Sequence, residues 1–206
     1  RLSGHSRAVW SVTWRPDGRR LATGSDDATA AIWDPADGRQ LHRLTGHTAG
    51  VWATGWSPDG RILVTGASDA LVRLWDGESG AAVGVIDAHP SLAKDARFSP
   101  DGRWLATCCD DHLVRIFDAS DWKLVCELRG HTHHVNTVDW TPDSRFLVSA
   151  SHDRTVRVWD VLGRRLVRVI AAHEDDIDAA SVSPDGLRIA SAGHDPPFVY
   201  RPAEDR

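Results

Sequence analysis

The chain has 206 residues and a formal net charge of −5, with 24 basic and 29 acidic side chains; 41% of the residues are apolar and 26% are charged. These values are typical of a globular protein with its own core, and they exclude a disordered chain. The mildly acidic balance argues against a surface built for nucleic acid or an anionic membrane, and no apolar run approaches the roughly 18 residues of a membrane span. We also expect no signal peptide.

A period of 42 residues divides the chain into five units, placed at 4–45, 46–87, 88–129, 130–171 and 172–206. Each unit opens on a Gly-His or Ala-His pair, and several later columns keep the same step. The opening pairs are Gly4-His5, Gly46-His47, Ala88-His89, Gly130-His131 and Ala172-His173. A Pro-Asp pair follows at 16–17, 58–59, 100–101, 142–143 and 184–185. A fixed period of this length predicts a repeat architecture in which each unit packs on the next.

Within one unit, short runs of β-forming residues alternate with turns. In the second unit these runs are 51–56, 62–65, 71–75 and 82–86. The segment Ser57-Pro58-Asp59-Gly60 predicts a turn between the first two runs, because proline presets φ and glycine accepts a positive φ. Helical periodicity is absent, so each unit is expected to form a four-stranded antiparallel sheet. One such sheet cannot bury both of its apolar faces alone, whereas stacked, twisted sheets form a ring.

The unit resembles the WD repeat of β-propellers in its Gly-His pair, its Ser-Pro-Asp-Gly turn, its fixed aspartate and its terminal Trp-Asp. The terminal pair stands at 33–34, 75–76 and 159–160, and the third unit has Phe117-Asp118 instead. The resemblance covers essentially the whole chain. It implies an all-β fold, a β-propeller of four-stranded antiparallel blades, forming a single domain over 1–206. Five blades would make a five-bladed ring or an open arc of a larger propeller; the arc is favoured because the sequence lacks methionine, which suggests a piece of a longer chain.

Each unit holds a histidine, a hydroxyl residue, an aspartate and an aromatic residue in fixed register. The sets are His5, Thr23, Asp27 and Trp33; His47, Thr65, Asp69 and Trp75; His89, Thr107, Asp111 and Phe117; His131, Ser149, Asp153 and Trp159; and His173, Ser191, Asp195 and Tyr200. A Ser-His-Asp nucleophilic triad is the alternative interpretation, but the set occurs five times, whereas catalysis needs one site. The resemblance implies that these groups form the family's buried tetrad. In such a tetrad indole donates to hydroxyl, hydroxyl to imidazole and imidazole to carboxylate.

Two of these sets depart from the pattern. Phe117 has no N–H donor, so the third blade should be less rigid. In the fifth unit, Pro196-Pro197 stands where the other units begin a strand, Tyr200 arrives one residue early, and Arg201 replaces the terminal aspartate. Because proline cannot donate to a ladder, we expect a frayed or edge strand there.

Columns whose chemistry varies between units are the candidates for partner binding, because shared columns build the scaffold. The resemblance implies that position 8, position 10, position 26 and their equivalents lie on the face that carries the Gly-His loops. The candidate partner-binding residues are Trp10, Asp26, Trp52, Ser68, Lys94, Asp110, His134, Asn136, His152, Asp176, Asp178 and His194. They are aromatic in the first two units, histidine-rich in the fourth and acidic in the fifth. Surface tryptophans are frequent binding hot spots; the alternative is that Trp10 and Trp52 only fill the central channel.

Three further features carry little functional signal. Four histidines suggest zinc, but no cysteine or carboxylate spacing completes a known site, so we expect no metal and no cofactor; they are His131, His133, His134 and His152. An acidic run could accept a basic segment or simply be solvated, and it comprises Glu174, Asp175, Asp176 and Asp178. The odd cysteine count fits a reducing compartment rather than a disulfide framework; the cysteines are Cys108, Cys109 and Cys126. Because 22 of the 24 basic residues are arginine, a GC-rich bacterial source is expected.

These features lead to three hypotheses of function. The first is a non-catalytic scaffold that presents loops and a channel mouth to a protein or peptide, with neither nucleic acid nor membrane as partner. The resemblance implies that such repeats are appended as a sensing or scaffolding module to a larger cytoplasmic protein. The second is an assembly piece that completes its ring by self-association through apolar side chains of the first and last blades, and strand register decides which of these side chains face outward. They are Val9, Val12, Leu21 and Ile32 in the first blade, and Ile177, Val182, Ile189 and Val199 in the last. The third is a propeller enzyme with a channel active site, which the innermost columns do not support.

Overall fold

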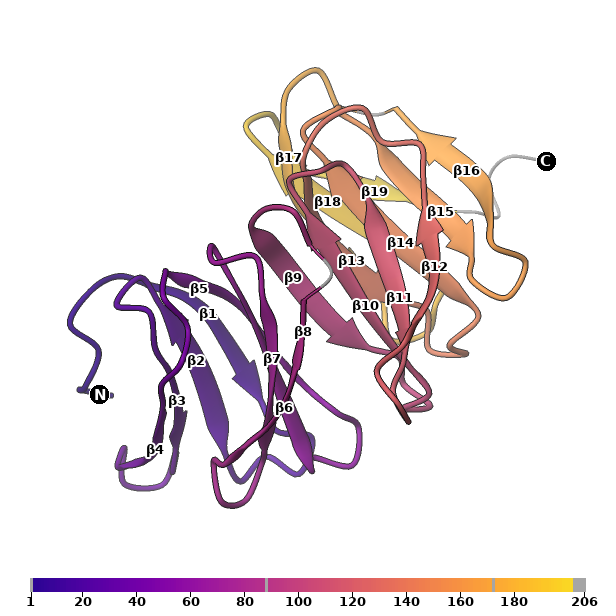
Figure 1. Cartoon of the computed structure of the whole chain (residues 1–206). Helices are drawn as coiled ribbons and strands as arrows, with labels where there is room; N and C mark the ends of the chain where they lie inside the picture. Colours follow the sequence, from indigo (N-terminus) through magenta and orange to yellow (C-terminus); the bar gives the residue numbers. More distant parts are fainter. Residues whose placement is uncertain (1, 88, 172, 202–206) are drawn as a thin grey trace. The chain divides into compact units, whose positions relative to one another are not determined.

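Short antiparallel strands joined by tight turns make up the protein, as a computed structural model describes it for residues 2–87, 89–171 and 173–201 (Figure 1). Arg1, Ala88, Ala172 and the polar tail 202–206 lie outside the described residues. The described residues contain no helix, so none that could cross a membrane. Each repeat contributes one antiparallel sheet, and the fifth sheet has three strands. The predicted all-β fold is therefore confirmed. The chain divides into two compact units, unit 1 (Arg1–Phe98) and unit 2 (Ser99–Arg206), with the boundary inside the third repeat.

Unit 1 contains the first two sheets and the first strand of the third repeat. Sheet 1 comprises β1 (Val9–Trp14), β2 (Leu21–Ser25), β3 (Ala30–Trp33) and β4 (Gln40–Leu44). Sheet 2 comprises β5 (Val51–Trp56), β6 (Ile62–Ala67), β7 (Val72–Asp76) and β8 (Ala82–Ile86), and β9 (Ala93–Phe98) follows. The four runs predicted in the second repeat are thus all strands, and β6 continues two residues beyond its predicted end.

The turn between β5 and β6 shows why the repeated Ser-Pro-Asp-Gly segment ends one strand and begins the next. Gly60 adopts φ of +70°, and its N–H donates to the Ser57 carbonyl at 2.8 Å. The Ser57 hydroxyl donates to Asp59 at 2.6 Å and accepts from the Ile62 N–H at 2.9 Å. The side chains therefore satisfy the backbone donors that the turn leaves free.

In unit 1, sheet 1 and sheet 2 share one apolar core. That core joins Ala22, Ala30, Ile32 and Leu44 of the first repeat to Val51, Trp56, Leu63, Ala67 and Trp75 of the second. The other face of sheet 2 lies against β9, where a Cβ on Gly55 would be 2.3 Å from the Ala96 carbonyl oxygen. Sheet 2 is therefore covered on both faces.

Unit 2 contains the rest of the third repeat and the last two sheets. It begins with β10 (Trp104–Cys109), β11 (Val114–Asp118) and β12 (Leu124–Leu128). Sheet 4 comprises β13 (Val135–Trp140), β14 (Phe146–Ser151), β15 (Val156–Asp160) and β16 (Arg165–Ile170), and sheet 5 comprises β17 (Ile177–Val182), β18 (Ile189–Gly193) and β19 (Phe198–Tyr200). Sheet 4 again packs on both sides: one cluster joins it to β10–β12, and another joins Val148 and Ile170 to Ile177 and Ile189 of sheet 5.

The bend between the second and third strands explains the irregular fifth repeat. In the other repeats a residue in this bend adopts left-handed φ, between 63° and 71°; these are Ala28, Ala70, His112 and Arg154. The equivalent residue in the fifth repeat is Pro196, whose ring fixes φ near −65°. The bend is one residue shorter there, since Ser191 pairs with Phe198 whereas Thr23 pairs with Ala31. Tyr200 consequently takes the ladder position of the missing tryptophan, opposite Ile189.

Candidate functional site

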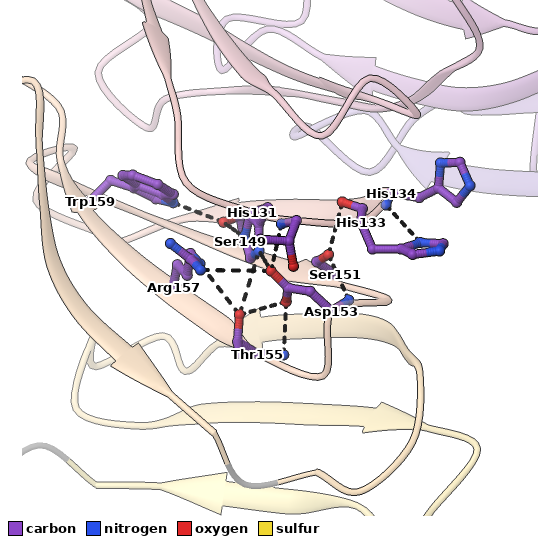
Figure 2. Close-up of polar contacts among 10 residues, drawn as sticks. His131, His133, His134, Ser149, Ser151, Asp153, Thr155, Arg157 and Trp159 are labelled. Atoms are coloured by element: carbon purple, nitrogen blue, oxygen red, sulfur yellow. Dashed lines mark hydrogen bonds and ion pairs between the residues drawn. The ribbon is translucent and has the colours of Figure 1, made fainter.

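A buried chain of hydrogen bonds joins the four tetrad side chains of the fourth repeat (Figure 2). The indole Nε1–H of Trp159 donates to Ser149 Oγ at 2.8 Å, and Ser149 Oγ lies 2.7 Å from His131 Nε2. The opposite ring nitrogen, Nδ1, lies 2.8 Å from an Asp153 carboxylate oxygen. Two strands, the opening loop and the bend are thereby tied together, because each residue comes from a different one of these segments.

The first and second repeats form the same arrangement. Trp33 donates to Thr23 at 2.8 Å and Trp75 to Thr65 at 2.9 Å. Each threonine oxygen lies 2.8 Å from the Nε2 of its histidine, and the aspartate oxygens lie 3.1 Å and 2.9 Å from Nδ1 of His5 and His47.

The tetrad carboxylates also hold the loop that carries each histidine. In the fourth repeat, Asp153 accepts the N–H of Thr132 at 3.1 Å and the hydroxyl of Thr155 at 2.6 Å. Burial opposes ionisation of Asp153, but hydrogen bonds from His131 and Thr155 outweigh it and keep the pKa of this carboxyl well below 3.8. Burial lowers the pKa of His131 below 6.5, although Asp153 opposes that shift. The pair is therefore a neutral imidazole beside a carboxylate at neutral pH.

The third and fifth sets have Phe117 and Tyr200 in the place of the tryptophan. His89 lies in unit 1, while Thr107, Asp111 and Phe117 lie in unit 2, where Asp111 pairs with the Arg115 guanidinium at 2.6 Å. In the fifth repeat His173 contacts Asp195 through Nδ1 and Ser191 through Nε2. The Tyr200 hydroxyl accepts a hydrogen bond from Arg168.

The tetrad geometry does not suit nucleophilic catalysis. Ser149 is fully buried, and its hydroxyl is engaged by both Trp159 and His131. A nucleophile must be reachable by substrate, which this oxygen is not. The arrangement can hold a loop to a bend, and the same geometry in three repeats supports that structural role.

The tryptophans at the tenth position of the first two repeats, Trp10 and Trp52, stand at β-bulges. The register of the first strand shifts between Val9 and Ser11, so Trp10 is the extra residue, and Trp52 is the extra residue of β5. A bulge turns a side chain away from the regular alternation of the strand. The two indoles stack with centroids 4.4 Å apart and planes at 17°, and Trp52 Nε1 donates to Ser68 Oγ at 2.7 Å. Trp10 is 51% exposed and Trp52 is partly exposed, so neither is buried between sheets.

The eighth- and twenty-sixth-position columns meet through the backbone. The backbone N–H of Asp26 donates to the Ala8 carbonyl at 2.9 Å, and the backbone N–H of Ser68 donates to the Gly50 carbonyl at the same distance. In unit 2, the backbone N–H of His152 donates to the His134 carbonyl at 3.0 Å, and the backbone N–H of His194 donates to the Asp176 carbonyl at 3.1 Å. The bend and the opening loop of each of these repeats therefore present their side chains at one end of the sheet. Lys94 lies on β9 and is partly buried.

The histidine-rich and acidic candidates come together within unit 2. His134 Nδ1 lies 2.9 Å from the Asp110 carbonyl oxygen, and Asn136 Nδ2 donates to the Ile177 carbonyl at 2.8 Å. His152 lies between two carboxylates, with Nδ1 3.5 Å from Asp176 and Nε2 3.4 Å from Asp178. His112, which is not among the predicted candidates, has its ring centroid 5.9 Å from that of His133. The equivalent residues of the first two repeats are Ala28 and Ala70, so a comparison between repeats would have singled out His112.

With the geometry established, comparison with known proteins identifies the class. The WD domain, G-beta repeat, family matches residues 1–34, 38–76, 80–118, 122–160 and 164–196, which is most of the chain. The protein therefore belongs to the WD-repeat family.

Individual relatives match over short stretches. Protein Mut11 of Chlamydomonas reinhardtii is 51% identical over 41 residues, which are 20% of this chain and 11% of that protein. Vegetative incompatibility protein HET-E-1 of Podospora anserina is 54% identical over 37 residues, 18% of this chain and 3% of that protein. The Notchless protein homolog of Arabidopsis thaliana is 48% identical over 33 residues, 16% of this chain and 7% of that protein. The matched part is thus at most about a ninth of these relatives. They are eukaryotic, so the bacterial source expected from arginine content finds no support among them.

Proposed function

We propose that this chain is a non-catalytic scaffold that binds a protein or peptide through the ends of its sheets where the opening loops and bends meet. The stacked pair Trp10 and Trp52 carries this proposal. Two large aromatic side chains stand at bulges that direct them out of the sheet, and one of them is half exposed. Exposed, pre-ordered tryptophans offer large contact area at low entropic cost, as expected of a binding hot spot. Membership in a family of interaction repeats supports the same role.

Selection from a displayed peptide library on the full chain tests this function. We expect Trp52→Ala, and to a lesser degree Trp10→Ala, to weaken binding of a selected peptide by about tenfold or more, while the melting temperature stays unchanged. Trp14→Ala is the matched control, because Trp14 is an exposed tryptophan on the same strand but outside the bulge. Equal binding by all three variants, or no peptide selected by the parent protein, would contradict the proposal.

We also propose that the chain is a scaffolding module of a larger cytoplasmic protein, as its family resemblance implies. The cysteine side chains support a reducing compartment, since Cys108 and Cys109 are buried and Cys126 packs against the core.

A second candidate is self-association through the first and fifth sheets, and the exposed apolar faces favour it. Ala22 and Ile32 pair across β2 and β3 and are completely buried in the core shared with sheet 2. Their ladder equivalents in sheet 5 are Ala190 and Val199, which are exposed. On the first sheet, Val12 is 64% exposed. Each of these faces carries side chains that another sheet covers elsewhere in the chain, so a second copy is a fitting occupant.

Sedimentation at micromolar concentration tests this second candidate. We expect a dimer or larger species that Val12→Asp dissociates, because a charge cannot be buried at such an interface without a partner. Val83→Asp, at an exposed valine of the outer strand β8, should leave the species unchanged. A monomer at all concentrations would contradict self-association.

A further inference from the structure

Histidines outside the tetrads gather in one region of unit 2. Six of the eleven histidines are not tetrad members, and five of these lie there: His112, His133, His134, His152 and His194. The rings of the first four lie against one another, with centroids between 4.5 Å and 5.9 Å apart. The fifth joins them through Asp178, whose carboxylate lies 3.4 Å from His152 Nε2 and 3.3 Å from His194 Nε2.

The acidic loop of the fifth repeat brings carboxylates to the edge of this group. One ligand atom each from Asp175, Asp176 and His194 lies within 4.8 Å of the others. The backbone fixes this arrangement, because the His194 N–H donates to the Asp176 carbonyl at 3.1 Å. The neighbouring Gly193 permits the close approach, since a Cβ there would stand 1.8 Å from that same carbonyl oxygen. The loop and the bend are therefore held together before any ligand binds.

We propose that Asp175, Asp176 and His194 bind a divalent transition-metal ion of the zinc class, with His152 at the open side of the site. His152 Nδ1 lies 3.5 Å from Asp176 and can supply a fourth ligand. An imidazole combined with carboxylates suits zinc better than magnesium, which prefers oxygen ligands and retained water.

One carboxylate–imidazole separation within the proposed site suits two ligands of one ion. His152 Nδ1 lies 3.5 Å from an Asp176 carboxylate oxygen, whereas a direct charge-assisted hydrogen bond would be shorter, about 2.7–2.9 Å. Two ligands on one tetrahedral zinc, each bonded at about 2.0–2.1 Å, stand about 3.3 Å apart. Asp178 lies 3.4 Å from His152 Nε2 and 3.3 Å from His194 Nε2, so it borders the site without being one of the proposed ligands.

The negative charge of the loop and its access to solvent also favour binding of a metal ion. Glu174, Asp175, Asp176 and Asp178 place four negative charges within five residues, and a divalent cation relieves their repulsion. The His194 side chain is 60% exposed and that of Asp176 is 36% exposed, so an ion reaches the site directly from solvent. Topology explains why the linear sequence does not show this site: the bend returns His194 to a loop about 18 residues earlier.

Calorimetric titration of the full chain, free of any oligohistidine tag, with zinc chloride at pH 7.5 tests the proposal. We expect one saturable equivalent with micromolar affinity, weakened at least tenfold by His194→Ala and by the near-isosteric Asp176→Asn. Zinc should raise the melting temperature of the parent protein but not of these variants. Magnesium chloride should give no saturable heat. These readouts do not depend on the proposed peptide-binding function.

His133→Gln is the matched control, because it removes an exposed imidazole of the same group without touching the three proposed ligands. It should change zinc affinity by less than threefold. Two results would overturn the proposal. One is the absence of saturable zinc binding by the parent protein. The other is binding that His133→Gln abolishes and His194→Ala leaves intact, which would place the ion among the stacked imidazoles instead.

Discussion

The first strands of the first two repeats have nearly the same sequence pattern and opposite surroundings. In unit 1, Val51, Thr54 and Trp56 of β5 are at most 7% exposed, whereas the equivalent Val9, Val12 and Trp14 of β1 are between 49% and 64% exposed. Both strands pair with their second strand in the same register and carry the bulge at the same place. The difference arises because sheet 1 and β9 cover β5 on its two sides, while β1 has sheet 2 on one side.

This contrast separates two kinds of information in a repeat sequence. The alternation, the turn residues and the tetrad specify a blade, and they operate within one repeat. The burial of a given apolar residue depends on the neighbouring blade, which its own repeat does not encode. An apolar column therefore predicts a face that can be covered, and the structure shows where it is covered.

The largest expected effect is a difference in stability between equivalent substitutions in β5 and β1. Trp56→Ala should reduce the free energy of unfolding by about 3–5 kcal/mol, because it leaves a cavity in the core shared by sheets 1 and 2. Trp14→Ala should cost less than about 1 kcal/mol, because the side chain is more than half exposed. Chemical denaturation measures both values.

Trp56→Phe provides the control for this pair. The Trp56 indole N–H is buried and has no hydrogen-bond partner among the described residues, so phenylalanine removes that cost while it keeps most of the apolar contact. It should retain more stability than the alanine variant. Equal losses for Trp14→Ala and Trp56→Ala would show that another surface covers β1 in solution.

A smaller effect should be the same in both repeats and so sharpens the comparison. The side chains of Asp27 and Asp69 are 4% and 5% exposed, although the first strands of their repeats, β1 and β5, differ strongly in exposure. Asp27→Ala and Asp69→Ala should each cost about 1–3 kcal/mol, because each leaves a buried imidazole without its carboxylate partner. Melting curves compare the two. A large difference between them would mean that the tetrad depends on the neighbouring blade.

Most of the blade could be predicted from the sequence. The strands of the second repeat, the Ser-Pro-Asp-Gly turn and the irregular fifth bend all follow from local chemistry that acts over a few residues. The fixed register of the four tetrad residues follows from the period, because five aligned copies act as an internal comparison, and their hydrogen bonding is what the resemblance to the WD repeat implies. Trp159, Ser149 and His131 lie in the predicted order of donors and acceptors.

The rest could not be predicted, because it depends on which loops meet. The varying columns predict Trp10 and Trp52 as candidates, but their stacking requires two bulges on neighbouring strands. The same columns predict His152 as a surface residue, yet the two carboxylates beside it belong to the next repeat. Contacts between repeats depend on strand twist and loop path, which a period of 42 residues does not specify.

The smallest expected effect concerns pH and acts on the tetrads rather than on the apolar faces. Burial lowers the pKa of both His47 and His131 below 6.5, despite the carboxylate beside each ring. The unfolded chain therefore takes up protons on these histidines at a higher pH than the native protein does. Their contribution to stability is fully present above about pH 6.5 and declines as pH falls below that value. The lowered pKa values of Asp69 and Asp153 produce a second decline below pH 3.8.

Melting temperatures recorded from pH 8 to pH 4.5 test this dependence on histidine. We expect a nearly flat profile down to about pH 6.5 and a steady fall below it. His47→Asn should lower the melting temperature overall and reduce the slope, because one of the groups that must stay neutral is gone. His42→Asn removes a histidine that bonds the Glu78 carbonyl outside any tetrad, and it should keep the parent slope. The difference in stability between Trp14→Ala and Trp56→Ala should stay constant over this range, since it arises from apolar contact. A slope that His47→Asn leaves unchanged would show that the tetrad histidines do not control the response to acid.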